Sequence, residues 1–460
     1  MNRTLSKFYK FNSNINLTRH SALFVNGAKA TEQFVYVSPH VDISEHLKYK
    51  DVTQSQLNKR KVNISLENVE NLWSVYKELK NRKEEYEQKK ADISRELGKL
   101  LKAEPDSETA KQMKIQVNLI KDNIRKLKVP LWSAEEAAIL EALKLPNNLH
   151  PKTPDDEYKI LHTHLSTPKN RKNHLTIGQT DSNLIKFKNN ENYYLTGDAA
   201  IFELGSKFHF SSILKRNNFV QLSNPDFVKS VIIEGCGENH RNPDSTYILH
   251  HNEETKVNKD SRLHLTGGAS LYSFWAYHTK NVIYSKVLPI KYFTMGRRYV
   301  PSSKQNGLFN VSQSTVIEVF GVTKTASELD NLVEELTDIL KSTFTEFNYH
   351  FRLVTVPANK LKMYESLRIE LQMFSTSLQQ YIDVANISLI GDFIPKRLMY
   401  TYVENKENKF PYVLSGTVLN VPKFLACVLE QDHNFVLPEY FSVNKWILFS
   451  CYFVPNIKIF

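Results

Sequence analysis

The sequence predicts an α+β protein: a central antiparallel sheet of roughly six or seven strands flanked by helices, preceded by an N-terminal helical hairpin. Three observations lead to this prediction. A seven-residue apolar repeat begins at Leu72, a helix-breaking segment at residues 104–107 separates it from a second apolar repeat, and ordered motifs between residues 150 and 445 belong to a larger domain. With 460 residues, 41% of them hydrophobic, the chain is long enough for two domains and a sizeable core.

The first part of the chain, residues 1–31, is basic and contains no Asp or Glu; the first acidic residue is Glu32. Its basic residues are Arg3, Lys7, Lys10, Arg19 and Lys29. This composition is typical of a mitochondrial transit peptide, with a disordered basic tail as the alternative. The apolar run Ser21–Val25 is too short for a secretory core or a membrane span. We therefore expect a protein of the mitochondrial matrix with no membrane span.

The second part, residues 32–149, is expected to form the helical hairpin. One seam position of the repeat is taken by Leu72, Leu79, Tyr86, Ile93 and Leu100, and the other by Tyr76, Lys83, Lys90 and Leu97. Repeats of this length predict a coiled coil, in which Lys83 and Lys90 would weaken self-pairing. Glu104-Pro-Asp-Ser107 should end this helix and cap a second one. That second helix repeats apolar residues in steps of four and three: Met113, Val117, Ile120, Ile124, Leu127 and Leu131.

The second helix also carries a concentration of positive charge. Between residues 109 and 128, Asp122 is the only acidic residue among six basic ones, namely Lys111, Lys114, Lys121, Arg125, Lys126 and Lys128. A basic face on a rigid rod suits a nucleic-acid phosphate backbone. The alternative is an ordinary solvated lysine face on a coiled coil. These six residues are our candidate nucleic-acid-binding residues.

The third part, residues 150–460, contains motifs that resemble those of the class II seryl-tRNA synthetases. Leu288-Pro-Ile-Lys-Tyr292, Arg297 to Tyr299 and Gly307 to Glu318 resemble L-P-I-K-Y, F-R-x-E and G-L-I-R-V-H-Q-F-x-x-V-E of that family. Pro411 to Glu430 resembles its third signature motif, L-N-G-S-G-L-A-V-G-R-T-L…L-E. The hairpin, ending in Leu143-Lys-Leu-Pro-Asn147, is similar to the tRNA-binding arm of the same family. The resemblance implies the class II synthetase fold.

The residues that do the family's chemistry are largely replaced. By the resemblance, Arg297 matches the arginine of the ATP α-phosphate, whereas Tyr299 replaces a Glu, and Ser270 stands where a carboxylate would hold the seryl amino group. Asn310, Ser312 and Ser314 replace an Arg, a His and the adenine-stacking Phe. Asp383 replaces a Glu, Leu389 an Asn, Ser415 an Asn and Lys423 an ATP-binding Arg, while Glu318 and Glu430 are retained.

These replacements predict a protein without catalytic residues. Adenylate formation depends on fixing ATP and serine and on placing positive charge where negative charge develops. Lysine keeps the charge of arginine but loses its planar fork. The loss of one transition-state donor costs about 10²–10³ in rate in other enzymes, so several losses together leave no plausible serine activation.

The whole chain resembles most the insect mitochondrial seryl-tRNA synthetase-like proteins, a non-catalytic branch of the family. The resemblance implies a regulatory or binding subunit that pairs with the active mitochondrial seryl-tRNA synthetase, through residues 217–237, or binds tRNA or another mitochondrial RNA. One alternative is a residual ATP-dependent seryl-tRNA ligase. Another is a protein-protein adaptor that does not bind RNA.

Metal and cofactor sites are not expected. Cys236, Cys427 and Cys451 lie far apart, without a C-x-x-C or a regular Cys/His spacing. The chain has 14 glycines and no Gly-rich phosphate loop. We therefore expect neither a zinc site nor a nucleotide-binding loop.

Overall fold

The computed structural model describes residues 21–24, 37–104, 107–169, 172–249, 262–302, 304, 306–432 and 435–442. The chain divides into two compact units, Met1–Leu57 with Val62–Leu145, and Asn58–Lys61 with Pro146–Phe460. Apart from residues 21–24, the expected transit segment 1–31 lies outside the described residues. No helix in the described ranges is long and apolar enough to cross a membrane.

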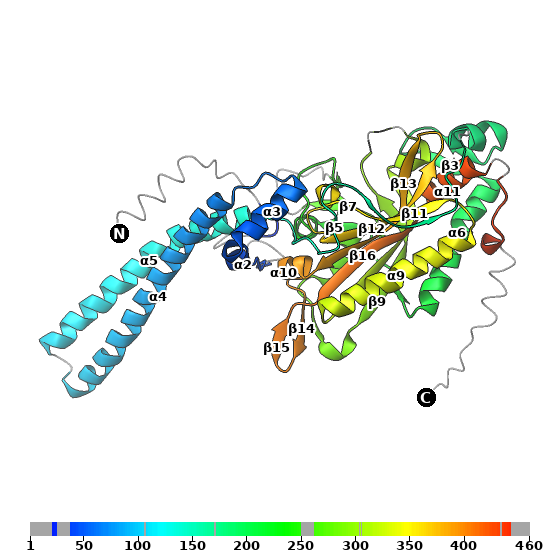
Figure 1. Ribbon diagram of the computed structural model, residues 1–460. Helices are drawn as coiled ribbons and strands as arrows, with labels where there is room; N and C mark the ends of the chain where they lie inside the picture. The colour runs from blue at the N-terminus through cyan, green and yellow to red at the C-terminus, as the bar shows by residue number, and fades with distance from the viewer. Residues whose placement is uncertain are drawn as a thin grey trace, which may run out of the picture. The chain divides into compact units, whose positions relative to one another are not determined.

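The smaller unit is dominated by the predicted hairpin of two long helices. They are α4 (Leu66–Ala103) and α5 (Glu108–Ala142), which lie side by side in Figure 1 after the shorter α2 (Ile43–Lys48) and α3 (Lys50–Arg60). Ser107 caps α5 as the sequence predicts, because its hydroxyl accepts a hydrogen bond from the N–H of Ala110 at 3.3 Å. Ser65 caps α4 in the same way.

The seam between these helices is buried where the repeats predict it. Leu79, Leu127 and Ala134 form its core, with Val75, Tyr76, Tyr86 and Leu131 packed against them. Lys83, expected to be buried at the seam, keeps 39% of its side chain exposed and lies 3.5 Å from Glu87. The charge of Lys83 is therefore partly solvated and lies beside a carboxylate of its own helix rather than being enclosed in the seam.

One feature of α5 was not anticipated from the sequence: Pro130 lies inside the helix. Proline has no backbone N–H, so the carbonyl of Lys126 lacks its helical donor at this point. Leu127 and Ala134, on either side of the proline, are both buried in the seam. Packing against α4 therefore supports the helix where its own hydrogen bonding is interrupted.

The larger unit is built on an eight-stranded sheet in the order β1-β11-β12-β13-β16-β10-β9-β4. Its strands are β1 (Lys159–His164), β11 (Phe351–Thr355), β12 (Leu367–Ser375), β13 (Gln380–Gly391), β16 (Tyr412–Asn420), β10 (Gln313–Thr323), β9 (Ile290–Tyr299) and β4 (Val220–Gln221). All neighbours are antiparallel except β4, which pairs in parallel with β9 at one edge. This predominantly antiparallel sheet matches the predicted fold class, although it has more strands than expected.

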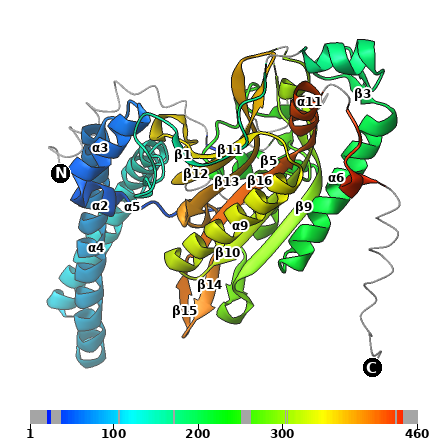
Figure 2. The ribbon, with the colours of Figure 1, turned by 45° about the vertical axis from the view of Figure 1, so that its right-hand side comes forward.

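Helices cover both faces of the sheet. On one face, α9 (Ala326–Glu346) and α11 (Val421–Gln431) lie over the central strands and share a core with α6 (Gly197–Arg216), as Figure 2 shows. On the other face, α8 (Leu271–His278) packs against β10, and its Phe274 ring stacks on Phe320 at 5.1 Å. Phe320 and its neighbour Val319 thus serve opposite layers, as strand alternation requires.

The other elements are short. Three further sheets occur among the described residues, with the orders β5-β7-β6, β15-β14-β8 and β2-β3. Their strands are β5 (Phe227–Lys229), β7 (Leu263–Leu265), β6 (Tyr247–Leu249), β15 (Glu407–Lys409), β14 (Thr401–Glu404), β8 (Val282–Tyr284), β2 (Ile185–Phe187) and β3 (Tyr193–Leu195). The remaining helices of the described ranges are α7 (Ser230–Gly235) and α10 (Phe393–Leu398), with short helical turns at Thr176–Asp181, Ser285–Val287, Gly307–Asn310, Ala358–Lys360 and Glu439–Phe441.

Candidate functional site

A cavity of about 380 Å³ lies against the central strands of the large sheet. Strands β9, β10, β12, β13 and β16 contribute to its wall, together with the start of α8. Seven of the lining side chains are charged: Glu238, Arg298, Glu318, Lys362, Glu365, Arg368 and Asp383. The cavity is therefore suited to a polar ligand rather than an apolar one.

A buried carboxylate, Glu318, forms one side of this cavity. It accepts hydrogen bonds from the hydroxyls of Thr417, at 2.7 Å, and Ser415, at 3.2 Å. The guanidinium of Arg298 donates to the Thr417 hydroxyl at 2.8 Å and lies 3.8 Å from Glu318. Burial raises the pKa of Glu318, and Arg298 and the two hydroxyls only partly oppose that effect.

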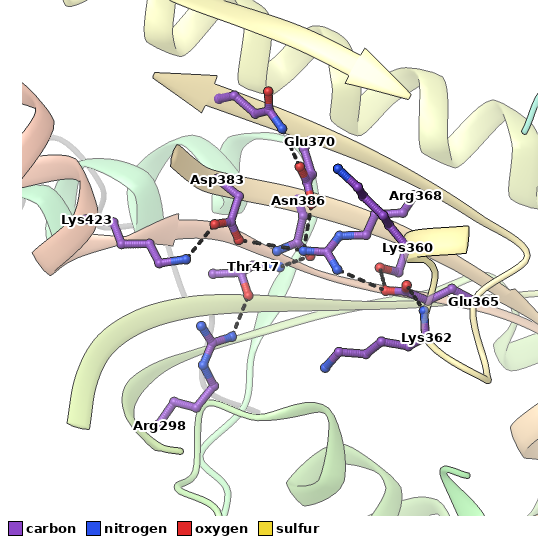
Figure 3. Close-up of polar contacts among 12 residues, drawn as sticks. Arg298, Lys360, Lys362, Glu365, Arg368, Glu370, Asp383, Asn386, Thr417 and Lys423 are labelled. Atoms are coloured by element: carbon purple, nitrogen blue, oxygen red, sulfur yellow. Dashed lines mark hydrogen bonds and ion pairs between the residues drawn. The ribbon is translucent and has the colours of Figure 1, made fainter. Parts of the chain in front are cut away.

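A second charged group centres on Arg368 of β12, drawn in Figure 3. One of its guanidinium nitrogens lies 2.9 Å from Glu370 Oε1 and 3.6 Å from Asp383 Oδ2. The other lies 3.9 Å from Glu365 Oε1, which also accepts a hydrogen bond from the Ser388 hydroxyl at 2.6 Å. One arginine is thus surrounded by three carboxylates, and their combined charge raises its pKa despite burial.

Asp383 connects this group to α11. Its Oδ1 accepts a hydrogen bond from the ammonium of Lys423 at 2.6 Å, while Oδ2 faces Arg368, as Figure 3 shows. Burial acts to raise the pKa of Asp383, but Lys423 and Arg368 outweigh it, so this pKa lies below its usual range. The carboxylate therefore bridges two cations.

Irregular strand pairing positions these side chains. In the β10–β16 pair, Ile317 pairs with Leu419 and Glu318 with Thr417, so that Val418 is skipped. In the β12–β13 pair, Val384 is skipped next to Asp383. Such bulges re-aim neighbouring side chains, and both occur beside residues of the cavity wall.

Five of the site residues proposed from the sequence line the cavity: Ser270, Tyr299, Glu318, Asp383 and Ser415. Lys423 lies beside it, bound to Asp383. The hydroxyl of Ser270 lies 2.8 Å from the carbonyl of Gly267 and accepts a hydrogen bond from the N–H of Ser273, which caps α8. This serine is therefore already engaged by the protein.

The other proposed site residues lie outside the cavity wall. Leu389 is buried in the apolar core. Ser312 and Ser314 are also buried, Ser314 near the start of β10 and Ser312 just before that strand. The amide of Asn310 donates to the carbonyl of Lys304. Arg297, expected at an ATP phosphate, lies 3.4 Å from Glu203 of α6 and donates to the Tyr193 hydroxyl.

Glu430, the retained residue at the end of the third motif, does not line the cavity and instead makes contacts inside the protein. Its carboxylate is fully buried and accepts hydrogen bonds from the His174 ring at 2.8 Å and from the hydroxyls of Ser375 and Ser377, both at 2.7 Å. The other ring nitrogen of His174 accepts from the N–H of Leu308. Glu430 thus joins α11, β12 and two loops.

The sequence reasoning missed several charged residues of the site. Arg298 rather than Arg297 faces the cavity, because in the β9–β10 pair Arg298 is opposite Ser314, which lies on the same face of β10 as Glu318. Residues two apart on a strand share a face, so counting in steps of two from Glu318 to Ser314 on β10, and then crossing to the partner of Ser314 on β9, identifies Arg298. Arg368 and Lys362 gave no comparable signal, since their role depends on which strands become neighbours.

The six candidate nucleic-acid-binding residues lie together on α5, in the smaller unit. All six side chains are exposed, and Lys128 lies over the Trp132 ring at 4.6 Å. Lys111 is 3.7 Å from Glu108. Exposure and clustering satisfy the electrostatic requirement for a polyanion.

The cavity wall is rich in groups that can recognise a polar ligand. Among the described residues that line it there is no His or Cys, and no cluster of three or more metal-ligating side chains occurs in the described ranges. Hydroxyls, carboxylates and guanidinium groups dominate the wall. Such a set can position a polar ligand.

Comparison with known proteins shows which proteins this chain is similar to. The profile described as "tRNA synthetase class II core domain (G, H, P, S and T)" matches residues 259–432. The seryl-tRNA synthetase-like protein Slimp of Drosophila melanogaster is 28% identical over 423 residues, covering 89% of each chain. The mitochondrial serine–tRNA ligase of Mus musculus is 25% identical over 386 residues, covering 79% of this chain and 73% of the mouse protein.

Solved structures agree on the fold. The seryl-tRNA synthetase from Pyrococcus horikoshii complexed with ATP aligns with a TM-score of 0.72 at 16% identity, covering 85% of this chain and 94% of that one. The cytoplasmic enzyme of Naegleria fowleri, in complex with AMP, gives a TM-score of 0.71 with similar coverage. Residues 259–432 therefore carry a class II tRNA synthetase core domain, in a chain that has the seryl-tRNA synthetase fold and is similar to the seryl-tRNA synthetase-like proteins.

Proposed function

We propose that this chain is a seryl-tRNA synthetase paralogue that does not activate serine and acts in mitochondria as a binding subunit. The carrying observation is the set of replaced or redirected residues in and near the cavity. Where the family resemblance requires a carboxylate for the amino group and an aromatic ring for adenine, the chain has Ser270 and Ser314. Arg297, which would hold a phosphate, is instead engaged by Glu203 outside the cavity. Adenylate formation depends on those positioned groups.

The test of inactivity is ATP–pyrophosphate exchange with serine, followed by every other amino acid, on the purified mature chain. We expect no exchange above the no-enzyme blank, while an active mitochondrial seryl-tRNA synthetase assayed in parallel exchanges normally. Exchange activity that is present in the wild type and lost in a folded Glu318→Ala variant would be due to this chain and not to a contaminating enzyme. That result would refute the proposal in favour of a residual ligase.

Binding of tRNA or another mitochondrial RNA is proposed for the basic face of α5. Six exposed cations within 18 residues provide a phosphate-binding surface on a rigid helix. Reversing Lys114, Lys121 and Arg125 to Glu should weaken binding to all RNA sequences and flatten its salt dependence, because each phosphate contact releases counterions.

A matched control for that variant exists on the other helix of the hairpin. Lys80, Lys89 and Lys99 of α4 are also exposed, so reversing them changes the net charge by the same amount. We expect the α5 variant to lose much more RNA affinity than the α4 variant. Equal losses would show a non-specific charge effect, and no loss in either would favour the protein-protein adaptor.

Pairing with the active mitochondrial seryl-tRNA synthetase is proposed through the small sheet β5-β7-β6. Phe227, Leu263 and Leu249 lie on one face of this sheet by strand register and are 51%, 45% and 39% exposed. Phe227 falls within the expected interface region 217–237. An exposed apolar face marks an interaction site, and a two-fold interface inherited from a common ancestor can pair two paralogues.

Co-expression of the two tagged chains, followed by native mass measurement, tests this pairing. We expect a heterodimer that is lost on Phe227→Asp with Leu263→Asp and kept in the control Tyr284→Asp. Tyr284 is 68% exposed but lies on β8, in a different sheet. Recovery of only homodimers or monomers of this chain would refute the heterodimer.

A mitochondrial location is proposed from the acid-free basic residues 1–31 and from the mitochondrial ligases among the relatives. Cell fractionation with N-terminal sequencing of the recovered protein is the measurement. We expect a matrix protein shortened at its N-terminus. A full-length cytosolic protein would contradict this location.

A further inference from the structure

Three cations at the cavity, Arg298, Arg368 and Lys423, are matched by carboxylates of the protein itself. Asp383 lies between two of them, with Oδ1 2.6 Å from the Lys423 ammonium and Oδ2 3.6 Å from the Arg368 guanidinium. Oε1 of Glu370 lies 2.9 Å from a nitrogen of the same guanidinium, and its Oε2 accepts a hydrogen bond from the side-chain amide of Gln372 at 2.6 Å. These are the contacts that phosphate oxygens make with Arg and Lys.

The charge balance of the cavity wall also opposes the binding of a phosphate group. The lining residues Glu238, Glu318, Glu365 and Asp383 outnumber the lining cations Arg298, Lys362 and Arg368. Adding the adjacent pair Glu370 and Lys423 leaves the acidic groups in excess. A polyphosphate entering this cavity would have to displace bound carboxylates and approach a wall with a net negative charge.

We propose that Asp383 and Glu370 are internal counter-ions that take the place of an anionic ligand on Lys423 and Arg368 and so close the cavity to polyphosphates. Neutralising them uncovers a latent polyphosphate-binding site within an intact fold. The arrangement in Figure 3 supports this assignment, since Asp383 stands directly between Lys423 and Arg368.

Asp383→Ala combined with Glu370→Gln tests the proposal, with inorganic pyrophosphate in magnesium-free buffer as the probe and isothermal titration calorimetry as the readout. The wall then carries more cations than carboxylates. We expect the variant to bind pyrophosphate at least about tenfold more tightly than the wild type, because one unit charge a few ångströms from the anion changes affinity by that much or more. Adding Lys423→Met should remove the gain.

The matched control neutralises two carboxylates that do not line the cavity, Glu334→Gln with Glu404→Gln, which pair with Lys152 and with Lys409 and Lys324. It raises the net charge of the protein equally and should not increase pyrophosphate binding. An equal gain in this control would overturn the proposal. So would a folded test variant without gain, or a wild type that binds as tightly as the test variant.

Asp383→Asn provides the same comparison with almost no change in side-chain size, in case the double variant does not fold. It removes one charge between Lys423 and Arg368, so a smaller gain in the same direction is expected, and its absence in the folded protein overturns the proposal. The inference deepens the proposed loss of serine activation, but the two fail separately. Exchange activity in the wild type refutes the loss of serine activation. Tight pyrophosphate binding by the wild type without exchange activity refutes only the counter-ion role of Asp383 and Glu370.

Discussion

Replacing Glu430 by Gln should destabilise the larger unit, because this carboxylate is a buried hydrogen-bond acceptor and not a ligand-binding group. Its oxygens accept from the His174 ring, from the hydroxyls of Ser375 and Ser377, and from the N–H of Ser377 at 3.1 Å. A glutamine has one accepting oxygen, and its amide nitrogen would face donors. Hydrogen bonds to a charged group contribute about 1.5–3 kcal/mol each, so we expect a loss of about 3 kcal/mol.

The pH dependence of this effect has a defined sign. Burial acts to raise the pKa of Glu430, but the hydrogen bonds from His174, Ser377 and Ser375 outweigh it, so this pKa lies below its usual range in the folded protein. A carboxyl group with a depressed folded pKa contributes stability above its unfolded pKa and loses that contribution as the pH falls through the folded value. The difference between wild type and Glu430→Gln should therefore be largest near neutral pH and shrink below about pH 4.

Thermal unfolding followed by circular dichroism is the assay, with Glu334→Gln as the control. Glu334 is 66% exposed and pairs with Lys152 across the surface, so its substitution should change the stability by less than about 0.5 kcal/mol. We expect Glu430→Gln to lower the melting temperature by roughly 5 °C at pH 7. A variant that melts within about 1 °C of the wild type would refute the reasoning and reopen a ligand-binding explanation for the retained glutamate.

Three further predictions follow from single contacts. Ser107→Ala should cost about 1 kcal/mol of local stability at the start of α5, seen as faster amide exchange in its first turn but not in α9. Burial raises the pKa of Glu318, and a raised folded pKa favours folding at low pH, an advantage that is lost as the pH rises. The stability of the wild type relative to Glu318→Gln should therefore be greater near pH 4 than at pH 7 in urea unfolding; the opposite trend would contradict the burial argument. Gly416→Ala should sharply reduce the yield of folded protein, because its Cβ would lie 2.3 Å from the backbone oxygen of Asn386 across the β13–β16 pair, and normal expression of this variant would contradict that close approach.

The parts of the fold that depend on neighbouring residues were predictable from the sequence. The seam of the hairpin follows from local apolar spacing, and the Ser107 cap follows from a serine after a helix-breaking proline. The parallel edge strand β4 is different, since it contains two residues and carries no periodic pattern. Its pairing with β9 depends on tertiary packing and not on the local sequence.

The candidate site was predictable only in part, for a geometric reason. Adjacent strand residues point to opposite faces, so a one-residue difference decides whether Arg297 or Arg298 reaches the cavity. Asp383 and Lys423 were each identified from the motifs, but 40 positions separate them, and their contact depends on packing of α11 against β13. Glu430 matches the family motif and could be taken for a residue with a chemical role, but its contacts are hydrogen bonds that hold the core together.

Pro130 interrupts the backbone hydrogen bonding of α5 next to its basic segment. It stands between the seam residues Leu127 and Ala134, and the segment from Lys111 to Lys128 lies wholly on its N-terminal side. A helix rises about 1.5 Å per residue, so Lys111 is roughly 28 Å from the proline along the axis. A change in direction of about 20° at a proline would sweep that lysine through roughly 10 Å. A bend at this one missing backbone hydrogen bond would therefore displace the whole basic segment, and Pro130→Ala would restore the bond without altering a single charge.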